Sequence, residues 1–150
     1  MLEMLLPRNL NNEYRGYRIA LWIFGLIIAV RALQSLMIIF NGPATIAGAD
    51  GIPLDTYPAG AAQTVLGIFA QNSLWRLIFS LMGVVALIRY RTAIPLMFTV
   101  MIITFAGAQA LSVYVPLART GSAPGLIVNR VMVGLMIVGL ALSMIERRRT

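Results

Sequence analysis

Three arginines lie inside long apolar runs of the sequence, at positions Arg31, Arg76 and Arg130. A charged side chain at the centre of a bilayer costs on the order of 2.5–3.5 kcal/mol by insertion scales. No aspartate or glutamate interrupts the same apolar runs to offset that cost. The planar guanidinium group binds carboxylates and phosphates well. We therefore predict that these arginines contact an anion that comes from outside the apolar runs.

Neutral polar side chains accompany the arginines at helical spacing. Arg31 and Gln34 are three residues apart and Asn72 and Arg76 are four apart, so each pair shares one helix face. The candidate ligand or partner contacts are Arg31, Gln34, Gln71, Asn72, Arg76, Gln109, Asn129 and Arg130. All of them fall in the middle or outer part of their runs. If the polar stripes face one another, they form a positively charged pocket open toward the outside.

Other interpretations of the same residues stay open. Polar side chains join membrane helices by hydrogen bonds worth roughly 0.6–2 kcal/mol each, which is the interpretation we favour for Gln71, Asn72 and Gln109. Arginine side chains also extend toward lipid headgroups, which we favour for Arg130. The anion that meets the arginines could be a ligand or a carboxylate of another subunit. Backbone carbonyls, glutamines and water could also satisfy the arginines without any anion.

The composition is that of a membrane protein. The chain has 150 residues, of which 59% are hydrophobic and 11% charged, and its mean hydropathy is +0.85. Histidine and cysteine are absent, which excludes thiolate chemistry, zinc fingers and histidine acid–base catalysis. The sequence therefore predicts no metal site and no cofactor. The 12 basic residues are all arginine, and most of them flank apolar runs, so we expect orientation signals and no nucleic-acid partner.

Four segments are long and apolar enough to span a membrane, and each needs roughly 20 residues to do so. They cover residues 19–40, 61–88, 93–115 and 124–145. We expect an all-α, four-helix transmembrane bundle of up-down-up-down topology, with residues 1–150 forming one integral membrane domain. Asn41-Gly-Pro ends the first span, Pro95 falls in the first turn of the third, and Ser122 or Ala123 is expected to cap the fourth.

Arginine counts near the span ends predict the orientation. Eight arginines fall in the N-terminal segment, the connection 89–91 and the C-terminal tail, whereas the opposite side has only Arg119. We therefore expect a multi-pass protein of the bacterial inner membrane, with both termini cytoplasmic. The loops 41–60 and 116–123 then lie outside.

The layout resembles that of a known group of proteins. The features are Asn41-Gly-Pro, Gly51-Ile-Pro-Leu, the connection Arg89-Tyr-Arg91, Pro95-Leu, the turn Thr120-Gly-Ser-Ala-Pro124 and the ending Glu146-Arg-Arg. Together they resemble the small four-helix bacterial membrane proteins of the DoxX-like group. That resemblance implies a four-helix membrane fold and, for some members, an association with quinone-linked redox systems. It implies no catalytic residue in this chain.

No enzyme motif is present in the sequence. Our first hypothesis is a non-catalytic accessory or scaffolding subunit of a larger membrane complex, whose partners are membrane lipids and other integral membrane subunits. The alternative is a protein that binds or transports an anionic amphiphile, a lipid or a quinone-like molecule in an outward-facing pocket. A membrane enzyme with a bound cofactor is a third class.

Overall fold

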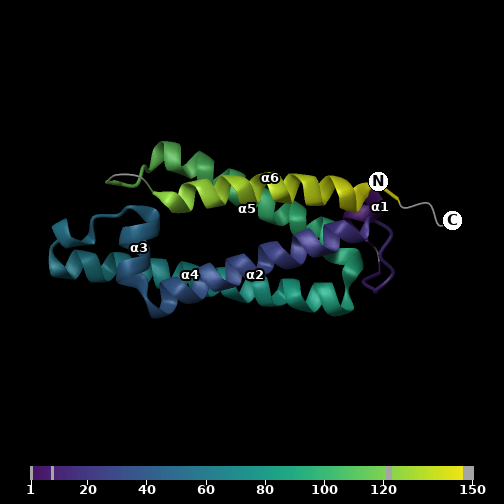
Figure 1. The fold of residues 1–150 in the computed structure, drawn as a ribbon, viewed down its shortest axis with the longest axis horizontal. Coiled ribbons are helices and arrows are strands. Elements are labelled where there is room, and N and C mark those ends of the chain that lie inside the picture. Colours follow the sequence, from purple (N-terminus) through teal and green to yellow (C-terminus); the bar gives the residue numbers. More distant parts are fainter. Residues whose placement is uncertain (1, 8, 121–122, 147–150) are drawn as a thin grey trace.

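The computed structural model describes residues 2–7, 9–120 and 123–146, and these parts contain helices and no strand (Figure 1). Four helices are long and apolar enough to cross a membrane. They are α2 (Arg18–Phe40), α4 (Ala59–Arg89), α5 (Ile94–Tyr114) and α6 (Pro124–Met144). Their bounds differ from the predicted spans by at most two residues, which confirms four apolar spans in an all-helical chain.

Proline positions explain where several helices begin. Pro43, Pro95 and Pro124 each occupy the first or second position of a helix, where a missing backbone N–H costs little. Pro95 is therefore in the first turn of α5, as the sequence predicts. The residue that precedes α6 is Ala123, one of the two expected caps, and Ser122 lies outside the described residues.

The segment 41–60, which the sequence predicts as a loop, is largely helical. It contains α3 (Gly42–Asp50) and a short 3₁₀ helix, η1 (Leu54–Thr56). The chain turns at Asn41 and starts α3 at once, because Pro43 favours a helix start. At its other end α3 stops at Gly51, whose φ of 69° is left-handed and favours glycine.

The long helices are arranged as two neighbouring pairs (Figure 1). Helix α2 packs most extensively on α4, and it also packs on α6, which in turn contacts α5. Gln34 of α2 meets Arg76 of α4, and Ile28 lies against Gly83, so α2 and α4 run in opposite directions. The short helix α3 lies between the pairs at one end and contacts α2, α4 and α6.

Small side chains allow α2 and α4 to approach closely. The buried residues of α4 are Ser73, Ser80, Gly83 and Ala86, which form one stripe along the helix. A Cβ atom at Gly83 would lie 2.9 Å from Ile28 Cγ2 and 3.3 Å from the Phe24 ring. Close packing of this kind is the main source of attraction between helices in lipid. Burying apolar side chains between helices gains little free energy there, because the lipid tails are equally apolar.

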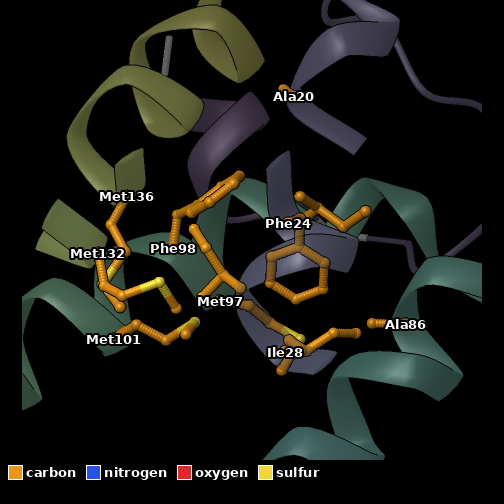
Figure 2. Packing of buried hydrophobic residues seen from close by; sticks show 11 residues of the cluster. Ala20, Phe24, Ile28, Ala86, Met97, Phe98, Met101, Met132 and Met136 are labelled. Carbon is orange, nitrogen blue, oxygen red and sulfur yellow. The ribbon is translucent and has the colours of Figure 1, made fainter. Parts of the chain in front are cut away.

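The principal hydrophobic core occupies the half of the bundle that contains the beginnings of α2 and α5 and the end of α6. Figure 2 shows Phe24 of α2 and Phe98 of α5 at its centre, with Met132 and Met136 of α6 beside them. The two rings meet edge to face, with centroids 5.2 Å apart and planes at 76°. A second, smaller cluster of Ile38, Ile46 and Ile52 lies where α3 folds back.

The N-terminal segment closes the end of the bundle that lies nearest the principal core. After the short helix α1 (Leu2–Leu5), the chain is tied to η2 (Arg91–Ala93), where the Asn11 and Thr92 backbones and the Thr92 hydroxyl exchange hydrogen bonds of 3.0–3.3 Å. The Tyr17 N–H then donates to the Leu142 carbonyl at 3.1 Å. These bonds place the N-terminal segment, the α4–α5 connection and the end of α6 together.

Candidate functional site

A group of polar side chains separates the two hydrophobic clusters. On α2, the buried residues Ile27 and Ile28 belong to the principal core and Ile38 belongs to the smaller cluster. Between them come three polar residues, and α4 adds two more at the same depth. This polar layer consists of Arg31, Gln34, Ser35, Arg76 and Ser80. Its depth within the spans makes it the candidate site.

The two arginines of the polar layer are half-buried and lie close together. They are near enough for their charges to repel each other across the α2–α4 interface. Arg76 Nη2 donates a hydrogen bond to Gln34 Oε1 at 3.5 Å, which is a long bond. The Nε atoms of Arg31 and Arg76 are buried and have no hydrogen-bond partner. Because a guanidinium group carries five N–H donors, both arginines keep donors for which the described residues supply no acceptor.

The serines of the polar layer do not satisfy the arginines. Ser35 Oγ donates to the Arg31 carbonyl and Ser80 Oγ donates to the Arg76 carbonyl, both at 2.9 Å. Hydroxyl groups that bond the preceding turn of their own helix in this way contribute little to binding between helices. Because these serine side chains are small, the two helices that carry the arginines can pack closely.

Asp50, the last residue of α3, is the acid that the fold brings toward this layer. It attracts both Arg76 and Arg119, but no ion pair within 4.0 Å joins it to either, among the described residues. Burial raises the pKa of Asp50 above its ordinary value, and the two arginines oppose that rise. The carboxylate lies beside Gly125 in the first turn of α6, where the helix dipole favours negative charge.

The remaining predicted contacts divide into two kinds. Asn129 of α6 is half-buried and its Oδ1 atom has no partner. Since Gly139 lies beside Ile23 and α6 runs opposite to α2, Asn129 falls at about the level of Leu33, close in depth to the polar layer. The side chains that the fold leaves exposed, outside the polar layer, are those of Gln71, Asn72, Gln109 and Arg130.

Two features of the structure were missed by sequence reasoning. One is the return of α3, which carries Asp50 toward Arg76. The other is a cavity of about 550 Å³ at the opposite end of the bundle, bordered by the N-terminal segment and the end of α6. In the sequence, the mostly polar segment from Asn9 to Glu13 could have indicated a polar cavity. A segment of this composition is equally typical of a terminus exposed to solvent, so it does not predict one.

The polar layer has the chemistry of an anion-binding site. It offers two cations, one amide and unused N–H donors in a partly desolvated setting, where hydrogen bonds to charged groups are strong. Neither a thiol nor an imidazole is available in the chain to perform catalysis there. The arrangement suits a carboxylate or phosphate that bridges the two guanidinium groups.

No family model, curated protein or solved structure matches this chain. The resemblance in layout to the DoxX-like group therefore stays a prediction.

Proposed function

We propose that the chain is a multi-pass protein of the bacterial inner membrane, with up-down-up-down topology and both termini cytoplasmic. The arginine distribution supports this orientation. The hydrogen bonds that join the N-terminal segment to Thr92 and Leu142 also support it, because they bring the segment with Arg15 and Arg18 to the connection with Arg89 and Arg91 at one end of the bundle.

Within that setting, we propose a non-catalytic function: binding of an anionic amphiphile, with its carboxylate or phosphate head between Arg31 and Arg76. The observation that carries this proposal is the pair of neighbouring, half-buried guanidinium groups whose Nε atoms lack partners. Two like charges held together at bilayer depth are costly without an anion between them. A bound head group would relieve both the repulsion and the missing hydrogen bonds.

A ligand explains this site better than an acidic partner chain does. The polar layer lies at the α2–α4 interface, where the Nε atoms of Arg31 and Arg76 are buried. A carboxylate on a neighbouring transmembrane helix would have to pass between packed helices to reach the Nε atoms. The head group of a single-chain amphiphile is small enough to enter by itself.

The test is binding of oleate and of lysophosphatidate to the purified protein in a neutral detergent, with oleyl alcohol as the uncharged probe. The double substitution Arg31→Gln and Arg76→Gln should lower the affinity for both anions about tenfold or more, since each charge-assisted hydrogen bond contributes roughly 1.5–3 kcal/mol. Arg130→Gln is the matched control, because Arg130 is a span arginine that lies exposed outside the polar layer.

Circular dichroism should show that both variants stay helical. Equal affinities of the wild type and the double variant for oleate and lysophosphatidate would reject the proposed site. Equal binding of oleyl alcohol and oleate by the wild type would show that the arginines do not recognise the head group, and would also reject it.

A second function, accessory subunit of a membrane complex, is favoured by α5. From Ile103 to Tyr114 this helix is exposed except at Phe105, and Gln109 is among the exposed side chains. An exposed glutamine in a membrane span is typical of a contact with another helix. Copurification in a mild detergent tests this function: a partner lost on Gln109→Leu supports it, and a chain that runs alone as a monomer contradicts it.

A further inference from the structure

The cavity at the end of the bundle near the principal core is built differently from the polar layer. Its wall contains the polar residues Glu13, Tyr14, Arg15, Ser143 and Glu146 and includes the apolar residues Met4 and Met144. The volume of about 550 Å³ is in the range of ligand-binding cavities, which runs from roughly 300 to 1,000 Å³. A cavity lined by both charged and apolar residues suits an amphiphile.

The charges of this wall are of both signs. Glu13 and Glu146 face one described cation, Arg15, which lies 4.0 Å from Glu146 with both side chains well exposed. A head group with both an ammonium and a phosphate matches both kinds of charge.

A buried hydroxyl in the same wall lacks a partner. Tyr14 Oη is shielded from solvent and makes no hydrogen bond, and burial raises the pKa of this phenol, so it stays protonated. A buried hydroxyl left without a partner costs roughly 1–3 kcal/mol, and a ligand that bonds to it removes that cost. Tyr14 can donate to a phosphate oxygen and accept from an ammonium N–H.

The cavity is held in place by its own backbone. The Asn11–Thr92 hydrogen bonds and the bond from Tyr17 to Leu142 fix the N-terminal segment on both sides of Tyr14. Gly16 permits this fit, since a Cβ atom there would lie 2.6 Å from the Ser143 carbonyl oxygen. The backbone of the wall is thus preformed, which lowers the entropy cost of binding, and only the Tyr14 side chain has to turn for its shielded hydroxyl to reach a ligand.

We infer that this cavity binds the head group of a zwitterionic phospholipid with a primary ammonium, such as phosphatidylethanolamine. The ammonium donates to Glu13 and Glu146, the phosphate accepts from Arg15 and from Tyr14 Oη, and the first part of the acyl chains lies against Met4 and Met144. The site is separate from the Arg31–Arg76 site and does not depend on it.

The test compares dioleoyl phosphatidylethanolamine with dioleoyl phosphatidylcholine, added to the delipidated protein and counted by native mass spectrometry. The quaternary ammonium of phosphatidylcholine has no N–H to donate, so the wild type should prefer phosphatidylethanolamine about tenfold, equivalent to one charge-assisted hydrogen bond. The double substitution Glu13→Gln and Glu146→Gln should abolish the preference. Asp55→Asn, which removes an exposed acid in η1 at the other end of the bundle, should leave it unchanged.

Tyr14→Phe distinguishes binding from a structural role. Because Tyr14 Oη bonds nothing in the protein, the substitution should leave the thermal unfolding temperature of the lipid-free protein unchanged or raise it, while lowering phosphatidylethanolamine binding several-fold. Equal binding of the two lipids by the wild type would overturn the inference. A preference that survives the double substitution, or Tyr14→Phe binding like the wild type, would overturn it as well.

Discussion

Gly139 of α6 leaves the space that the Phe98 ring of α5 fills. A Cβ atom at this position would clash with two ring carbons of Phe98 and would lie 3.2 Å from Ile23 Cγ2. Phe98 is fully buried and its edge-to-face contact with Phe24 fixes the ring, so the ring has little room to move away. The absence of one methyl group therefore sets the distance between α5 and α6.

Gly139→Ala should accordingly destabilise the bundle by about 1–3 kcal/mol, the usual cost of overpacking a core. Thermal unfolding in detergent measures the effect. Gly134→Ala is the matched control on the same helix, because a Cβ atom at Gly134 meets nothing within 4 Å. Similar unfolding temperatures for the two variants would show that Phe98 does not pack against α6 in this way.

Asp50 gives a pH dependence whose sign follows from its surroundings. Burial raises the pKa of its carboxyl above the ordinary value of 3.8, more than Arg119 and Arg76 lower it. The folded chain therefore binds the proton more tightly than the unfolded chain. The resulting stability is complete below pH 3.8 and is lost as the pH rises through the raised pKa of Asp50.

Asp50→Asn should remove this dependence, because the amide does not ionise. We expect the unfolding temperature of the wild type, relative to that of Asp50→Asn, to fall between pH 3.8 and neutrality. Asp55→Asn serves as the comparison, since Asp55 is exposed. A difference between wild type and Asp50→Asn that grows in the opposite direction would contradict the burial of this carboxyl.

Helix α3 is positioned by a close backbone approach to α6. A Cβ atom at Gly125 would lie 2.8 Å from the Ala49 carbonyl oxygen, so glycine is needed for the two backbones to meet. Gly125→Ala should push α3 and Asp50 away from α6 and destabilise the smaller cluster. In Gly48→Ala, on α3 itself, the new methyl group meets nothing within 4 Å.

We expect Gly125→Ala to lower the unfolding temperature and Gly48→Ala to leave it unchanged or raise it slightly, since alanine favours a helix over glycine. Limited proteolysis within residues 41–60 should become faster in Gly125→Ala alone. Equal cleavage of both variants and the wild type would show that α3 does not depend on this contact.

The hydropathy of the chain could predict the four long helices because each one is a continuous apolar run bounded by glycine, proline or arginine. It could not predict α3, whose nine residues have no apolar stripe long enough to separate a short helix from a loop. Within the candidate site, Arg76 of α4 meets Gln34 of α2, whereas the spacing in the sequence gives the helix face of each residue and not which faces meet. The exposure of Gln109 and Arg130 depends on how α5 and α6 are rotated, which their nearly uniform apolar sequences do not determine.

The whole molecule is unevenly packed along its length. The buried α5 side chains of the principal core lie between Ile94 and Met101, and beyond Ile102 the helix is mostly exposed. Helix α4 has 31 residues, about 46 Å at 1.5 Å per residue, which exceeds a hydrocarbon core of about 30 Å. Most of the buried apolar contacts thus lie at one end of the bundle. The other end, which is packed less tightly, contains the polar layer and α3.

This asymmetry gives a testable orientation, because the N-terminal segment with Arg15 and Arg18 meets the connection with Arg89 and Arg91 at the packed end. The chain has no cysteine, so single cysteines can be introduced without removing any other. Asn12→Cys lies in the exposed N-terminal segment and Thr56→Cys lies exposed in η1, at opposite ends of the bundle. In intact cells a membrane-impermeant maleimide should label Thr56→Cys at once and should label Asn12→Cys only after the membrane is permeabilised. The reverse pattern would place η1 on the cytoplasmic side and the N-terminal segment outside, and labelling of both in intact cells would rule out a bundle that spans the membrane between them.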